Sequence, residues 1–260
     1  MKKGKMKKLL AMLLSTVTLL SLAACGGGEG DTKTESMNNS YAGTSVYFGP
    51  GGNGNATISV EENLKDFKCI TFGTYEQDND TSNGAEDIEW LVLDEQDGKT
   101  LVISKYALDA MAFREDQSFS RWPNSTLRAW LNADFYNTAF SDSEKSMILT
   151  SNVKAEKNPR NDEDTGADTQ DKVFLLSIGD VEKYFVSDKK MMCEPTEYAI
   201  AQGATPNKND GGSCQWWLRT HGDNLGWAAA IYSHGGIDYY GNEVEDSSTA
   251  VRPAMWITIG

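Results

Sequence analysis

The chain is poor in histidine and in basic residues. The first shortage argues against a catalytic zinc site, and the second argues against nucleic-acid binding. Only 2 histidines, His221 and His234, occur among 260 residues. Neither stands at a spacing to other His or Cys residues that is typical of a catalytic zinc site. No serine is flanked by the glycines of a nucleophile elbow. Asp and Glu number 38 against 24 Lys and Arg, and such an acidic surface repels nucleic acid.

Long apolar runs are absent beyond the first residues, and the run found there is short. Leu9 to Leu22 follow five lysines and span about 14 residues, whereas a membrane-spanning helix needs roughly 20. The run ends in Leu22, Ala23, Ala24 and Cys25, which resembles a bacterial lipoprotein signal. The resemblance implies cleavage before Cys25, a diacylglycerol on its sulfur and an extracytoplasmic domain anchored to the cell membrane. A retained transmembrane helix is the alternative.

Cleavage at that place makes the remaining chain more acidic. Residues 1–24 hold five lysines and no acid, so 19 basic residues remain against 38 acidic ones, a formal charge of −19. Anionic lipid headgroups are repelled by such a surface. We therefore expect the lipid on Cys25 to be the only membrane anchor.

Composition divides the chain into a signal peptide, a tether and one domain. Residues 26–45 are rich in Gly, Glu, Asp, Thr, Ser and Asn and contain little to bury, which predicts a flexible tether. Residues 46–60 are ambiguous and are treated as a loosely attached extension. The expected divisions are 1–24 for the signal peptide, 25–63 for the lipidated cysteine with its tether and extension, and 64–260 for the domain.

Local patterns in the domain predict an α+β fold. Asp97 and Gly98 stand between two apolar runs and predict a hairpin. Ser125, Ser141 and Ser177 are predicted N-caps. With the apolar positions that follow, the sequence predicts four short helices, over 126–132, 141–149, 177–185 and 196–202. Short strands are expected near the C-terminus, over 216–219, 227–232, 236–240 and 250–259. Helices in the middle with antiparallel strands at the end are typical of the α+β class.

Several segments together resemble one bacterial family. The C-terminal segments are Trp216 to Thr220, Gly235 with Gly236, and Val251 to Ile257. The upstream segments are 72–73, 88–90, 104–108, 125–131, 139–141, 172–177 and 195–199. They are similar to domain-of-unknown-function family 6273, found in secreted and lipid-anchored bacterial proteins, over about residues 65–260.

The ending of that family is similar to formylglycine-generating enzymes and to C-type-lectin-like receptor-binding domains. The resemblance therefore implies a C-type-lectin-like fold, with helices and a compact, loop-rich antiparallel sheet. It implies no established activity.

Two arginines and two cysteines stand out in the apolar part of the sequence. Arg219 and Arg252 are expected to meet carboxylates or carbonyls, because an unpaired buried guanidinium is costly. A fold-locking ion pair is favoured over a clamp for a substrate carboxylate. Cys193 and Cys214 are predicted to lie close together and to form a disulfide, which an exported domain retains.

Metal or redox use of the cysteines is the alternative. Formylglycine-generating enzymes place two cysteines close in sequence near the end of the domain to bind copper. This chain has no such pair, which weighs against an oxidase.

The segment 220–249 is the strongest candidate for a ligand-binding surface. Aromatic residues occur there among glycines, serines and asparagines, a composition typical of adaptable recognition surfaces. In related C-type-lectin-like proteins this region carries ligand contacts. The candidate ligand-binding residues are Trp227, Tyr232, His234, Asp238, Tyr239 and Tyr240. Simple strand alternation, with half of these side chains packed inside, is the alternative.

We therefore expect a lipid-anchored, extracytoplasmic domain that binds a glycan or a protein at the cell surface without catalysis. No catalytic residue, metal or cofactor is expected apart from the diacylglycerol on Cys25. The acids of 156–171 lack the EF-hand pattern, and calcium dependence, ligand identity and oligomeric state stay open. An exported formylglycine-generating-type oxidase and a structural envelope protein are the alternatives.

Overall fold

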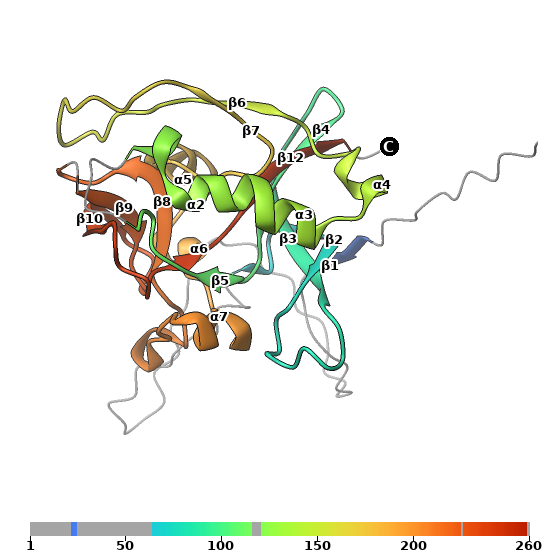
Figure 1. Cartoon of the computed structure of the whole chain (residues 1–260). Coiled ribbons are helices and arrows are strands. Elements are labelled where there is room, and N and C mark those ends of the chain that lie inside the picture. Colours follow the sequence, from blue (N-terminus) through green and yellow to red (C-terminus); the bar gives the residue numbers. More distant parts are fainter. Residues whose placement is uncertain (1–21, 25–63, 116–120, 225, 259–260) are drawn as a thin grey trace, which may run out of the picture.

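The computed structural model describes residues 22–24, 64–115, 121–224 and 226–258 (Figure 1). Cys25, which is predicted to be lipidated, the predicted tether 26–45 and the predicted extension 46–60 lie outside these residues. Strand β1, Leu22–Ala24, comes from the predicted signal peptide and pairs antiparallel with strand β2, Lys68–Tyr75.

One five-stranded sheet joins the beginning of the domain to its end. Its order is β1-β2-β3-β4-β12, and every neighbouring pair is antiparallel. The further strands are Glu86–Gln96 (β3), Lys99–Ser104 (β4) and Ala254–Thr258 (β12). Asp97 and Gly98 both have positive φ, at 52° and 72°, which gives the predicted two-residue hairpin turn between β3 and β4.

A second five-stranded sheet has the order β10-β9-β8-β11-β5. Its strands are Asp109–Ala110 (β5), Trp216–His221 (β8), Trp227–Ile231 (β9), Ile237–Glu243 (β10) and Ala250–Val251 (β11). The β8, β9 and β10 strands are antiparallel, whereas β11 runs parallel to β8.

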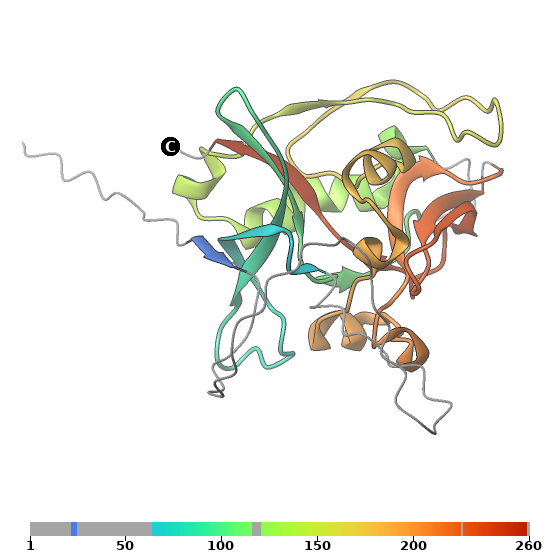
Figure 2. The ribbon, with the colours of Figure 1, turned by 180° about the vertical axis from the view of Figure 1, so that it is seen from behind.

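The last predicted strand is divided between the two sheets. The sequence predicts a strand over 250–259 with a bulge or an unpaired position at Pro253, and in the structure β11 ends at Val251 and β12 begins at Ala254. Pro253, between them, has no N–H to donate to a ladder, and a proline therefore suits this break. The chain crosses from the second sheet to the first at this point, as Figure 2 shows from behind.

The helices are short, and three of the α-helices in the described residues begin at predicted caps. Ser125, Ser141 and Ser177 each accept a backbone N–H from the first turn of a helix. The α-helices are Thr126–Trp130 (α2), Tyr136–Ala139 (α3), Asp142–Lys145 (α4), Ile178–Tyr184 (α5), Asp188–Met191 (α6) and Glu197–Gln202 (α7). Two 3₁₀ turns and a π-helical segment complete them, at Trp122–Asn124 (η1), Lys208–Asp210 (η3) and Leu131–Phe135 (η2).

Two helix predictions need correction at their ends. The helix expected over 126–132 continues from α2 through η2 and α3 to Ala139, and it lies across the two sheets in Figure 1. The helix expected over 141–149 ends at Lys145. Beyond it, Leu149 N–H donates to Trp256 O at 2.9 Å, so tertiary pairing with β12 replaces further helix.

A hairpin arm runs along the top of the molecule in Figure 1, over β8, β9 and β10. Its strands are Ser151–Val153 (β6) and Thr169–Asp171 (β7), and residues 154–168 form a long loop between them. The tryptophans Trp90, Trp216 and Trp217 lie in the core without exposure. Each of their indole N–H groups donates to a backbone carbonyl, at 2.7, 3.0 and 2.9 Å, which satisfies its polar atom inside the core.

Candidate functional site

The edge strand β10 and the connection between β9 and β10 present aromatic rings to solvent at one edge of the second sheet. Tyr232 is 37% exposed and Tyr240 is 55% exposed. The ring of Tyr232 stacks on the exposed ring of His234, with centroids 5.2 Å apart and planes 12° from parallel. Three of the predicted ligand-binding residues are therefore open to solvent.

Asp238 holds the backbone that carries these rings. It is buried, and its Oδ1 accepts the N–H groups of Tyr240 at 3.1 Å and Gly241 at 3.0 Å. These bonds fix a bulge at which the β9–β10 register shifts. Burial, with a hydrogen bond to Asp238, raises the pKa of the Tyr232 hydroxyl, which therefore stays protonated at neutral pH. Asp238, predicted to contact a ligand, is placed to position its neighbours.

Arg160 from the β6–β7 loop joins the same surface. Its guanidinium carbon lies 4.8 Å from the ring centroid of Tyr239 and 5.2 Å from that of Tyr240, within cation–π range. Buried Asn158 anchors this loop, because its Nδ2 donates to Tyr239 O at 2.7 Å and to His221 O at 3.0 Å. Sequence reasoning missed both loop residues, since nothing local links them to strands more than 60 residues away.

We call the surface formed by Arg160, Tyr232, His234, Tyr239 and Tyr240 the tyrosine face. Tyr239 is half-buried, and its hydroxyl donates to Glu182 Oε1 at 2.8 Å. Trp227, the remaining predicted residue, is half-buried at the start of β9.

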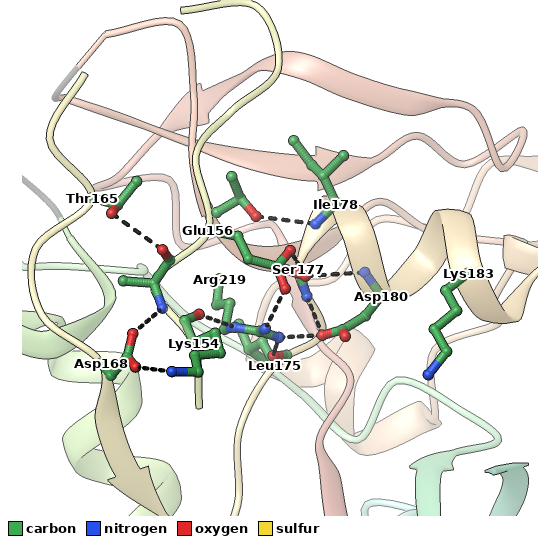
Figure 3. Close-up of polar contacts among 12 residues, drawn as sticks. Lys154, Glu156, Thr165, Asp168, Leu175, Ser177, Ile178, Asp180, Lys183 and Arg219 are labelled. Carbon is green, nitrogen blue, oxygen red and sulfur yellow. Dashed lines mark hydrogen bonds and ion pairs between the residues drawn. The ribbon is translucent and has the colours of Figure 1, made fainter. Parts of the chain in front are cut away.

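Arg219 lies at the centre of a second polar cluster (Figure 3). Its side chain is buried, and its Nη1 donates to Leu175 O at 2.9 Å and to the Asp180 carboxylate. Its Nη2 lies 3.5 Å from Glu156 Oε1. Ser177, the N-cap of α5, donates its hydroxyl to Glu156 Oε2 at 2.6 Å. The arginine therefore ties β8, α5 and the β6–β7 loop together, as expected of a fold-locking ion pair.

His221 borders a small hollow beside this cluster. The hollow, of about 10 Å³, has room for about one water molecule and is also lined by Arg121 and Thr165. His221 Nδ1 lies 2.7 Å from Gly222 O, and its buried Nε2 has no hydrogen-bond partner in the described part of the chain.

Arg252 meets carbonyls, one of the two kinds of partner expected for it. It is fully buried, with Nε donating to Ser104 O at 2.8 Å and Nη2 to Lys105 O at 3.4 Å. Its guanidinium carbon lies 5.1 Å from the ring centroid of Trp216. Burial lowers the pKa of Arg252, since the charged form is deprived of water.

Cys193 and Cys214 lie side by side near this arginine. The N–H of Cys214 donates to the carbonyl of Cys193 at 2.8 Å, and both side chains are buried. Burial raises the pKa of both thiols. Both are free thiols in the structure, so the predicted disulfide is not present in it and stays a prediction.

Possible metal ligands gather at one place among the described residues. Carboxylate oxygens of Glu76 and Asp78, in the β2–β3 connection, and of Glu86, the first residue of β3, lie within 4.8 Å of one another. Neighbouring backbone N–H groups already donate hydrogen bonds to these carboxylates. For example, the N–H of Gln77 donates to Glu86 Oε2 at 2.7 Å. Exposed acidic groups of this kind are common without an ion.

These features define an α+β domain built on two five-stranded sheets, with an exposed aromatic surface at one edge. The sequence pattern of the family described as "Domain of unknown function (DUF6273)" matches residues 97–259, and the chain belongs to this family. The family expected from the sequence is thereby confirmed, with a match that begins later than residue 65. No curated protein and no solved structure matches the chain. In the described segments, no helix combines the length and apolar character needed to cross a bilayer.

Proposed function

We propose that this protein is a lipid-anchored, extracytoplasmic domain that binds a glycan or a protein through its tyrosine face, without catalysis. The lipoprotein-like signal ending at Cys25 supports the anchor and the location. The loop-rich antiparallel strands that carry the face are compatible with a C-type-lectin-like fold, which is part of the proposal.

One observation carries the proposal: the chain holds several aromatic rings at its surface in fixed positions. Tyr232 is stacked on His234, and Tyr240 lies beside Arg160 while remaining 55% exposed. Tyrosine and arginine are enriched among the residues that dominate protein interfaces. Because backbone bonds to Asp238 hold the bulge, little conformational entropy is lost on binding.

The cysteine pair does not favour the oxidase alternative. Cys193 and Cys214 are buried, and the charge of Arg252 acts on both thiols. A copper ion placed between them would meet this guanidinium, which repels a second cation.

The proposal is tested by probing a glycan array and a protein array with residues 46–260, and by changing the face. The double variant Tyr232→Ala, Tyr240→Ala should abolish binding of any ligand found, because it removes the most exposed rings. The melting temperature should stay nearly unchanged, since exposed side chains contribute little to stability. Val186→Ala, which removes a 90% exposed apolar side chain outside the face, is the matched control. A large loss of stability with unchanged affinity would contradict the proposal.

A further inference from the structure

A hollow of about 160 Å³ opens where α5 meets β4, β6 and β12. We call it the α5 hollow. Its apolar and aromatic lining comes from Leu101, Phe174, Tyr184 and Trp256, and Glu156, Asp180 and Arg219 contribute charged groups. Ser151 and Asn152 add polar groups, so the lining is mixed and more polar than apolar. Concave sites in which polar groups converge beside apolar and aromatic side chains suit small ligands.

Three charged side chains of the lining reach the solvent: the carboxylates of Asp180 and Glu156, and Lys154, which is 65% exposed. The side chain of Arg219 is 6% exposed, whereas those of Asp180 and Glu156 are 23% and 38% exposed. The two carboxylates therefore stand between the guanidinium and the solvent. Lys154, a further cation in the lining, has its ammonium 2.6 Å from Asp168 Oδ2 and is neutralised there.

The aromatic lining also favours a cation. Tyr184 and Trp256 are half-buried, and the faces of such rings attract ammonium groups. The chain already shows this preference next to the hollow. The ammonium of Lys183 lies 4.4 Å from the ring centroid of Tyr184 and 3.6 Å from Asp94 Oδ2.

We propose that the α5 hollow binds a primary ammonium on a short aliphatic chain, such as the side chain of a lysine in a partner. The carboxylates of Glu156 and Asp180 would accept hydrogen bonds from the ammonium. The methylenes would contact the side chains of Leu101, Phe174 and Trp256. An aminobutyl group is small enough for the hollow, which at about 160 Å³ is many times larger than the one-water hollow beside His221. This site is separate from the tyrosine face and does not depend on the proposed function.

The test uses the full chain in detergent with ¹⁵N-labelled tryptophan, and the probe is Nα-acetyl-lysine methylamide. The indole signal of Trp256, assigned with Trp256→Phe, should shift and saturate as the probe is added. The Nε-acetylated probe keeps the chain but lacks the charge, and it should bind at least about fivefold more weakly. Because this comparison uses the unaltered protein, it is independent of any variant's folding.

Glu156→Gln should lower the affinity for the lysine probe about tenfold, because the charge-assisted hydrogen bond to the ammonium is replaced by a weaker, neutral one. Glu163→Gln, an exposed acid of the same loop outside the hollow, should leave the affinity unchanged. Equal binding of the two probes, or unchanged affinity in a folded Glu156→Gln, would overturn the proposal. A shift with glucosamine but not with the lysine probe would overturn the assignment to an aliphatic chain.

Discussion

Asp109 shows how one residue links stability to pH. Its carboxylate is buried in β5, where it accepts the hydroxyl of Tyr75 at 2.7 Å and the N–H of Ala110 at 2.8 Å. Burial raises the pKa of Asp109, and the two hydrogen bonds only partly offset this effect. The pKa of Tyr75 is also raised, by burial and by the charge of Asp109.

The stability of Asp109→Asn, measured relative to that of the wild type, should increase as pH rises. A carboxyl whose pKa is raised by folding contributes its full stability below the unfolded pKa, which is about 3.9 for Asp. This contribution is lost as pH rises from the unfolded pKa through the folded pKa. Asparagine does not titrate, so the free energy of unfolding of Asp109→Asn minus that of the wild type should increase from about pH 4 to pH 7. Urea unfolding at intermediate pH values measures it. A difference that decreases with pH would contradict the assignment.

Within one element, Gly73 shows why β2 bulges where it meets the helices. It has φ of +73°, and an added Cβ would lie 2.6 Å from the Phe140 ring and 2.7 Å from Ala139 O. Its N–H donates to Glu144 Oε1 at 2.9 Å. The β2–β3 register shifts between Thr71 and Thr74, so the strand deforms where it contacts the end of α3 and the start of α4.

Gly73→Ala should therefore destabilise the domain by about 3–4 kcal/mol, from a left-handed backbone together with overpacking. Gly98→Ala is a matched control, because its φ is +72° but a Cβ there meets nothing within 4 Å. That control should cost only about 1–2 kcal/mol. Chemical denaturation of both variants gives the comparison. Equal losses would show that the close approach to Phe140 is unimportant.

At the scale of the whole molecule, the domain is closed by the end of its chain. Strand β12 pairs with β4, where Ala254 lies opposite Ile103, while β11 pairs with β8 and β5. Arg252 lies between β11 and β12 and donates to the carbonyls of Ser104, the last residue of β4, and of Lys105. Both sheets therefore depend on residues 250–258, and we expect the domain to unfold in one cooperative transition.

The proposed attachment of the whole molecule to the membrane predicts the effect of Cys25→Ser. Without the sulfur no thioether to diacylglycerol forms, so the protein should be released or remain unprocessed in a native-like host. Membrane fractionation and mass analysis of the N-terminal peptide measure this outcome. Gly27→Ser, in the same segment, should be processed and retained normally. Equal retention and processing of Cys25→Ser would contradict lipid anchoring.

The sequence by itself determined the features whose causes lie within a few residues. The caps at Ser125, Ser141 and Ser177 and the turn at Asp97 and Gly98 were predictable, because a side chain satisfies N–H groups two or three positions away, or because a turn needs positive φ. The α+β class and the family followed from the order of such signals. The aromatic composition of 220–249 also indicated where rings would gather.

Only the tertiary structure decided which of those rings are exposed and what lies beside them. The bulge at Asp238 sets Tyr240 outward, and Arg160 reaches it from another hairpin. Arg252 donates a hydrogen bond to the carbonyl of Ser104, which is 148 residues away in the sequence. Contacts at such separations are selected by the packing of the whole core, in which each burial depends on all the others, so no local pattern encodes them.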